Sequence, residues 1–210
     1  MNYIQEYVDK IRSGEIIVSS KVKTLYYKLE DDIKNPKEIQ IYDEINDEYE
    51  NHRYIFDESK ANRPIQFIEK FCKHSKGRKF AGKPVKLELW QKAFISAIYG
   101  FVDEETGFRK YRKALLFIAR KNGKSTLAAA LGLYMLTSDG EAGAECYSIA
   151  TKKDQAKIVW KEAKRMIKKS PVLLKRVRPL VAELYYEKQE AVFLPLSSDS
   201  NSLDGLNAYY

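Results

Sequence analysis

The sequence predicts an α/β fold in which helices flank a parallel β-sheet, preceded by a mostly helical N-terminal segment. Three observations in the 210-residue chain carry this prediction. An apolar run at 114–119 ends in a glycine-containing turn and opens into an apolar helix at 125–136. A second strand at 145–150 leads into a helix at 152–169, and a further strand is expected at 191–195. Strands and helices that alternate at these lengths favour a parallel sheet with packed helices.

The N-terminal segment is expected to be helical through residue 50. Its apolar side chains recur at helical spacing until Gly14 ends the first helix: Tyr3, Ile4, Tyr7, Val8 and Ile11. The acidic cluster at 43–50 is interpreted as a solvated face. Asn62–Pro64 marks an expected boundary, which divides the chain into an adaptor segment at 1–62 and a core at 63–210.

Between this boundary and residue 114, the sequence predicts two helices and two connecting segments. The helices cover 65–72 and 88–99. A basic, glycine-bearing connector at 76–84 separates them, and a turn at 103–107 follows the second helix. We find no internal repeat and no low-complexity tract.

The junction at 120–126 has the residue types of a phosphate-binding loop. A helix N-terminus presents unpaired N–H groups and a partial positive charge, which attract phosphate. Gly123 lets the backbone turn close to the phosphates. Lys124 would place its ammonium on the β- and γ-phosphates, and Ser125 would hold Mg²⁺, with Thr126 beside it. The junction therefore predicts the binding of a nucleoside triphosphate.

The loop departs from the usual pattern, because Ile118 stands where a glycine normally begins it. Arg120, Lys121 and Asn122 instead lead into the turn. The simpler interpretation of the two cations is a basic loop at the end of a strand. The sharper one is that Arg120 reaches the γ-phosphate as an arginine finger does from its own chain. Both interpretations stay open on the residues alone.

Charge is unevenly distributed along the chain. Residues 1–60 carry 9 basic and 14 acidic side chains, whereas residues 61–210 carry 28 basic and 15 acidic ones. The excess is strongest at 151–180, with 11 basic and 2 acidic residues, where Thr151–Asp154 is interpreted as a helix cap. This basic helix face is either simply solvated or attracts a nucleic-acid backbone without reading its sequence.

Composition excludes several other classes of protein. No run of 18 apolar residues exists, so no membrane span is expected. The first ten residues lack the layout of a signal peptide. The two cysteines, Cys72 and Cys146, are far apart and are expected to be reduced and structural. His52 and His74 lack metal-ligand partners at useful spacing, so a histidine-based nuclease is not expected.

Several motifs in a fixed order resemble the large subunit of the tailed-bacteriophage terminase, the motor that pumps DNA into a preformed capsid. The resemblance extends along essentially the whole chain and includes the form of the phosphate loop that lacks the first glycine. The stretches that carry it are 67–70, 74–77, 81–91, 120–126, 150–156 and 202–207.

The resemblance implies a helicase-like P-loop NTPase that uses ATP and Mg²⁺. It places adenine recognition at Trp90 and Gln91 and a γ-phosphate-sensing role at Arg120. It also implies DNA contacts near the start of the 152–169 helix, by the residues Thr151, Lys152, Lys153 and Lys157. The implied partners are double-stranded DNA, the portal protein, the small terminase subunit and further copies of the chain, in the host cytoplasm.

Terminase large subunits continue after a stretch like 202–207 into a strand that ends in Asp-Glu, and then into a nuclease domain. We expect this chain to end before both, and therefore to bind nucleotide weakly and to be catalytically incomplete. Two alternatives remain: a helicase-like translocase unrelated to packaging, and a non-enzymatic nucleic-acid-binding protein whose Gly-Lys-Ser stretch is accidental. An Asp-Glu pair soon after residue 210 would distinguish a terminase from the first alternative. The second alternative predicts that Lys124→Ala leaves nucleotide affinity unchanged.

Overall fold

The computed structural model describes residues 1–43 and 46–198, and the chain divides into two compact units. The first unit contains Met1–Gln66 and Leu87–Leu116. The second contains Phe67–Lys86 together with the chain from Phe117 onward. The expected carboxyl-terminal motif at 202–207, and the expected end before an Asp-Glu strand, lie outside the described residues.

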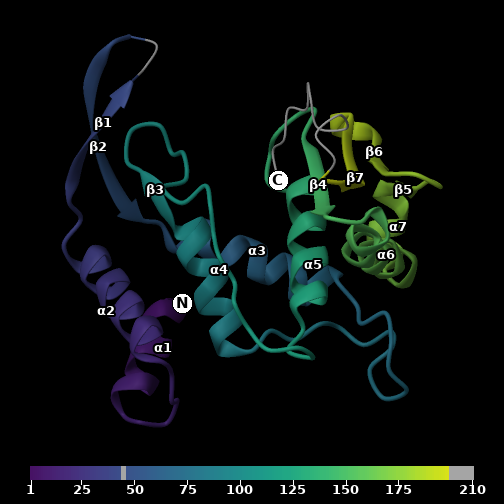
Figure 1. The fold of residues 1–210 in the computed structure, drawn as a ribbon, viewed down its shortest axis with the longest axis horizontal. Coiled ribbons are helices and arrows are strands. Elements are labelled where there is room, and N and C mark those ends of the chain that lie inside the picture. Colours follow the sequence, from purple (N-terminus) through teal and green to yellow (C-terminus); the bar gives the residue numbers. More distant parts are fainter. Residues whose placement is uncertain (44–45, 199–210) are drawn as a thin grey trace. The chain divides into compact units, whose positions relative to one another are not determined.

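The first unit is built on two N-terminal helices and one from the middle of the chain, as Figure 1 shows. α1 (Tyr3–Arg12) and α2 (Ser20–Lys34) pack with α4 (Leu89–Gly100). Asn2 caps α1, because its Oδ1 accepts hydrogen bonds from the N–H groups of Ile4 and Gln5, both at 3.1 Å. The helical spacing predicted for the first segment is confirmed, since Ile4, Tyr7, Val8 and Ile11 are buried in the core of this unit. The other members of this core come from later elements: Tyr26, Leu29, Ala93 and Phe101.

The expectation of helix through residue 50 is wrong from residue 38 onward. β1 (Glu38–Asp43) and β2 (Glu48–Phe56) form an antiparallel hairpin, and β2 also pairs with β3 (Phe101–Asp103). Ile39, Ile41 and Tyr42 are residue types that favour strands, and all three are partly exposed in β1. Tyr42 lies opposite Tyr49, with ring centroids 5.2 Å apart. Of the acidic cluster, Asp47, Glu48 and Glu50 lie on this hairpin and are exposed, so the expected solvated face is confirmed for these three residues.

The boundary expected at Asn62–Pro64 lies inside a helix. α3 runs from Glu58 to Phe71, so it begins earlier than the predicted 65–72 helix. Three apolar side chains at helical spacing, Ala61, Ile65 and Ile68, are all buried. Their burial stabilises the helix across Pro64, which has no backbone N–H and cannot donate a hydrogen bond. The predicted 88–99 helix and 103–107 turn are confirmed, the former as α4.

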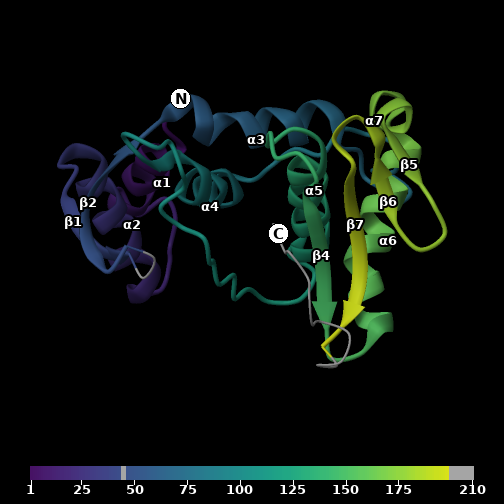
Figure 2. The ribbon, with the colours of Figure 1, turned by 90° about the horizontal axis from the view of Figure 1, so that it is seen from above.

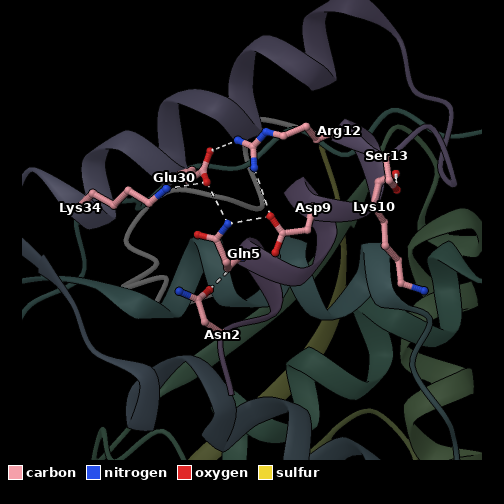
Figure 3. Close-up of polar contacts among 8 residues, drawn as sticks. All are labelled: Asn2, Gln5, Asp9, Lys10, Arg12, Ser13, Glu30 and Lys34. Carbon is pink, nitrogen blue, oxygen red and sulfur yellow. Dashed lines mark hydrogen bonds and ion pairs between the residues drawn. The ribbon is translucent and has the colours of Figure 1, made fainter.

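A buried carboxylate joins the two N-terminal helices (Figure 3). The side chain of Glu30 on α2 is only 8% exposed, and its oxygens lie 2.7 Å from both Arg12 Nη2 and Lys34 Nζ. Gln5 Nε2 donates to the same carboxylate at 2.8 Å. Hydrogen bonds from Lys34 and Gln5, with that of Arg12, lower the pKa of Glu30 to about 2. The ionised carboxylate therefore stabilises the folded unit.

We expect Glu30→Gln to destabilise the first unit by about 1.5 kcal/mol at pH 7, the typical worth of a charged hydrogen-bond partner. Because the folded-state pKa of Glu30 is lowered, its contribution is present above its unfolded pKa and is lost as pH falls toward 2. Urea unfolding at pH 7 and pH 3 should therefore show a smaller difference between wild type and variant at pH 3. Glu15→Gln removes an exposed carboxylate and is the control; an equal effect there would contradict the prediction.

The second unit contains a mixed sheet rather than the parallel one predicted. Its strands are β4 (Glu145–Ala150), β5 (Val177–Pro179), β6 (Leu184–Tyr186) and β7 (Ala191–Ser197), in the order β4-β7-β6-β5. Only β4 and β7 are parallel. A short 3₁₀ turn (Glu187–Gln189) joins β6 to β7, and so short a connection permits only antiparallel pairing. The strands predicted at 145–150 and 191–195 are confirmed as β4 and β7.

Two helices pack against β4 and β7, and Figure 2 shows them side by side behind these strands. They are α5 (Lys124–Thr137) and α6 (Lys153–Lys169), which confirm the helices predicted at 125–136 and 152–169. The indole N–H of Trp160 on α6 donates to the carbonyl of Phe193 on β7 at 3.0 Å. The short helix α7 (Pro171–Arg176) follows α6.

The strand predicted at 114–119 is absent from the described part of the chain. These residues have no regular structure, and the side chains of Leu115 and Phe117 are 90% and 95% exposed. A strand forms only where a neighbouring edge satisfies its backbone groups, and 114–119 pairs with no described strand. Apolar composition alone therefore did not determine this element.

Both cysteines are buried and free, as expected for structural thiols. Burial raises the pKa of Cys72 to about 12 and that of Cys146 to about 12, so neither is a reactive thiolate at neutral pH. Within residues 1–43 and 46–198, no helix is long and apolar enough to cross a membrane.

Candidate functional site

The loop before α5 contains two residues in the left-handed backbone conformation. Lys121 and Gly123 both have positive φ angles, of 69° and 76°. A glycine accepts this conformation freely, whereas a lysine does so only when the local structure imposes it. The Asn122 amide contributes by donating to the carbonyl of Ala119 at 3.4 Å. Arg120, Lys121 and Lys124 are all exposed to solvent.

α5 begins at Lys124 with an open N-terminus. Its N-cap residue is Gly123, which has no side chain to satisfy the free N–H groups of the first turn. The Lys124 ammonium folds back over the loop and donates to the carbonyl of Ile118 at 2.6 Å. The cation and the open N-terminus therefore occur in the same short segment, which suits a phosphate.

The side chains of Ser125 and Thr126 line a pocket of about 410 Å³ in the second unit. Its other walls come from α6 and from the segment between α3 and α4. α6 contributes Ile158, Lys161, Glu162 and Arg165, and the other segment contributes His74, Ser75 and Lys76. Pockets of about 300–1,000 Å³ are the size that binds small molecules. Two of the predicted site residues thus face a defined cavity.

Backbone hydrogen bonds fix the segment that carries His74. The backbone N–H of His74 donates to the carbonyl of Lys83, and the N–H of Gly82 donates to the carbonyl of His74, both at 2.9 Å. The N–H of Val85 donates to the carbonyl of Cys72 at 3.0 Å. The basic connector predicted at 76–84 is therefore a closed loop. The ring of His74 lies 5.7 Å from that of Phe80, so this histidine packs as well as lining the pocket.

Glu162 connects two walls of the pocket. The Ser75 hydroxyl lies 2.7 Å from each of its carboxylate oxygens, and Arg165 Nη1 lies 3.7 Å from one of them. The Glu162 side chain is only 12% exposed. The carboxylate therefore holds a hydroxyl and a guanidinium in place beside Ser125 and Thr126.

The predicted DNA-contacting residues lie together at the start of α6. Lys152 and Lys153 are exposed, whereas Lys157 is half-buried and pairs with Asp154 at 3.6 Å. The predicted cap at 151–154 is wrong in detail. The N-cap residue is Lys152, and its side chain makes no capping hydrogen bond to the first turn of α6. The Thr151 hydroxyl instead donates to Gln155 Oε1 at 3.2 Å.

One of the basic residues of the 151–180 stretch, Lys164, does not lie on a solvated face of α6. The Lys164 ammonium lies 4.7 Å above the Trp160 ring and donates to the carbonyl of Leu180. Burial, with Lys168 nearby, lowers the pKa of Lys164. Lys164 therefore packs within the unit, and the solvated face is narrower than the sequence suggested.

The residues predicted to recognise adenine belong to the first unit. Gln91 acts in the capping box of α4, where its Oε1 accepts from the N–H of Glu88 at 2.9 Å. Trp90 is half-buried against the core of that unit. His52 binds Asp103 at 2.8 Å and has a structural partner there. Adenine binding by Trp90 and Gln91 stays a prediction.

Sequence reasoning missed the pocket residues outside the phosphate loop. The sequence predicted no ligand-binding role for His74, Ser75 and Lys76, and Lys161 and Arg165 entered only as part of the basic stretch at 151–180. The signal that could have found the site is Glu162, a carboxylate among six cations at 157–169, for which the buried contact with Ser75 now gives a reason.

The residues present fit ATP with Mg²⁺. Among the described residues, no group of three His, Cys, Asp or Glu side chains could hold a metal by itself. Mg²⁺ in nucleotide sites needs only one or two protein oxygens, because water and phosphate supply the rest. The Ser125 hydroxyl beside an uncapped helix N-terminus meets that requirement.

Comparison with known proteins gives consistent results. The family described as "Terminase large subunit, ATPase domain" matches residues 89–209. The chain is 32% identical over 152 residues to the terminase large subunit of Enterobacteria phage HK97, covering 71% of this chain and 29% of that protein. The crystal structure of the HK97 large terminase superposes with a TM-score of 0.58 at 29% identity, over 70% of this chain and 29% of that one.

The chain thus spans 29% of the length of the curated relative that it matches. The family match includes the phosphate loop, α5, α6 and the whole of the described sheet of the second unit. More than half of the chain is therefore accounted for by one family, and the chain belongs to the terminase large subunits, in the region of their ATPase domain.

Proposed function

We propose that this chain is the ATP-binding part of a motor that hydrolyses ATP to move double-stranded viral DNA into a procapsid. The observation that carries the proposal is the segment 120–126 inside the family match. There an exposed lysine, a left-handed glycine and an uncapped helix N-terminus occur together. No other class of ligand suits this combination as well as a chain of phosphates.

Each loop residue has a proposed role in holding the nucleotide. Lys124 leaves the Ile118 carbonyl and binds the β- and γ-phosphates, and the N–H groups of Lys121, Asn122 and Gly123 surround them. Arg120 stabilises the charge that develops at the γ-phosphate. Ser125 holds Mg²⁺, which when bound neutralises phosphate charge, and Thr126 lies next to it. Trp90 and Gln91 are proposed to contact adenine.

The first test is calorimetric titration of the chain with ATPγS, with Mg²⁺ and with EDTA. Binding that requires Mg²⁺ supports the proposal. If ATPγS fails to bind at millimolar concentration to a chain that circular dichroism shows to be folded, nucleotide binding by this region is contradicted.

The start of α6 is the proposed DNA-binding surface, formed by Thr151, Lys152, Lys153 and Lys157. Its support is the exposure of Lys152 and Lys153 within the most basic part of the sequence. Because Lys157 already pairs with Asp154, we assign most of the attraction to the two exposed lysines. Such contacts bind the backbone and read no sequence.

We expect Lys152→Ala/Lys153→Ala to weaken binding of a 20-base-pair duplex equally for unrelated sequences. Fluorescence anisotropy at several salt concentrations should show the log–log salt slope reduced by about 2, since each phosphate contact contributes about 0.9. Lys21→Ala/Lys28→Ala, two exposed lysines of the first unit, is the control. An equal reduction in the control would show that net charge alone is responsible.

The remaining expectations concern the complete packaging machine. We propose that residues 1–62 act as an adaptor and that 63–210 contribute to the ATPase, a division by role that need not coincide with compact packing units. The proposed partners are the portal protein, the small terminase subunit and further copies of the chain, in the host cytoplasm. The endonuclease activity expected from the resemblance stays a prediction.

A further inference from the structure

The pocket beside the first turn of α5 is more cationic than the phosphate loop alone requires. Lys76, Lys161 and Arg165 line it, and neither lysine forms an ion pair with another residue of the described ranges. All three side chains are exposed, so water screens their mutual repulsion, and together they create a positive potential at the pocket that attracts an anion. Glu162 offsets only one of these charges.

The rest of the lining is suited to a sugar and not to a bare anion. Hydroxyl groups come from Ser75, Ser125 and Thr126. Ile158 adds an apolar surface, and its side chain is 55% exposed although it lies in a pocket wall. Hydroxyls, cations and one apolar surface together match a phosphorylated sugar.

The pocket is also continuous in sequence with the loop proposed to hold the terminal phosphates. Ser125 and Thr126 directly follow Lys124, and their side chains face the pocket. A ligand whose β- and γ-phosphates lie on Lys124 would therefore bring its next part, the α-phosphate and ribose, to these hydroxyls. This step depends on the proposed function.

We infer that this pocket binds the α-phosphate and ribose of the nucleotide, with Lys76, Lys161 and Arg165 as ligand-contacting residues. Glu162 is a positioning residue, because it holds the Ser75 hydroxyl and the Arg165 guanidinium. The pocket thereby adds affinity that depends on the nucleoside and that the phosphate loop does not supply.

Calorimetry of the 210-residue chain with two ligands in Mg²⁺ tests this inference. ATPγS has the α-phosphate and the nucleoside, and inorganic pyrophosphate lacks both. For Lys161→Ala/Arg165→Ala we expect the affinity for ATPγS to fall about tenfold, with pyrophosphate binding changed less than about twofold. Lys168→Ala/Lys169→Ala removes the same charge from exposed positions of α6 outside the pocket, and should change neither.

Lys76→Ala, from a different segment, should lower ATPγS affinity in the same selective way, which keeps the test valid if the double variant fails to fold. Unchanged ATPγS affinity in the pocket variants, or an equal loss for both ligands, would overturn the inference. So would a loss confined to binding of a 20-base-pair duplex, which would assign the pocket to DNA phosphate.

Failure of the proposed function gives a different pattern. Lys124→Ala should weaken both ligands, and if it weakens neither, the phosphate loop is not the site whatever the pocket variants do. If Lys124→Ala weakens both while the pocket variants behave as wild type, the proposed function stands and the inference about the pocket is wrong.

Discussion

Lys124→Ala is expected to lower the affinity of the chain for Mg²⁺-ATPγS about 100-fold. The variant removes the cation proposed to contact two phosphates. Hydrogen bonds to charged groups contribute about 1.5–3 kcal/mol, and the upper end of that range corresponds to about 100-fold in affinity. We expect little loss of stability in the variant, because the ammonium is exposed and, among the described residues, its hydrogen bond goes to the Ile118 carbonyl within its own loop. Calorimetry measures the affinity.

Two further variants show whether charge or geometry is responsible. Lys124→Arg keeps the charge but replaces a compact ammonium with a planar fork, so we expect it to recover only part of the affinity. Lys188→Ala removes an exposed lysine of the same unit and should bind as wild type does. Wild-type affinity in Lys124→Ala would contradict the assigned role of this loop.

Gly132→Ala is expected to destabilise the second unit by about 3 kcal/mol, although alanine is normally the better helix former by about 1 kcal/mol. Gly132 lies in the middle of α5. A Cβ atom added there would lie 2.8 Å from Cε1 and 3.2 Å from Cζ of the Phe193 ring. Phe193 is 1% exposed, so the ring has little room to move. Urea unfolding, followed by circular dichroism, measures the change.

A second substitution tests the stated cause. Phe193→Leu shortens the side chain that the new methyl group meets, so Gly132→Ala/Phe193→Leu should be less destabilised than the sum of the single variants. The indole hydrogen bond of Trp160 goes to the backbone carbonyl of residue 193 and is retained. Strictly additive effects would show that the clash with this ring is not the cause.

Much of the local structure could be predicted from the sequence. Residues 3–12, 89–100, 124–137 and 153–169 are helical in the structure because their apolar side chains recur at the spacing of one helix face or fill a buried helix. The strands 145–150 and 191–197 follow the same logic for buried extended segments. In these cases a short window of sequence contains the decisive interaction.

The predictions that failed concern segments whose structure depends on contacts with residues far away in the sequence. β1 and β2 form through pairing between strands, whereas helix was predicted through residue 50. The apolar run at 114–119 lacks such a partner among the described strands and stays irregular. Pro64 was taken as a boundary, yet burial of Ala61, Ile65 and Ile68 carries α3 through it.

The motifs along the chain carry the family resemblance and predict the phosphate loop, since residues 120–126 are consecutive and the chemistry proposed for them depends on local backbone geometry. Only the tertiary structure brought His74, Ser75 and Lys76 to α6 and to the first turn of α5, because loop closure and the Ser75–Glu162 contact join segments nearly 90 residues apart. A contact of that separation leaves no periodic signal in the chain, whereas a turn between a strand and a helix does.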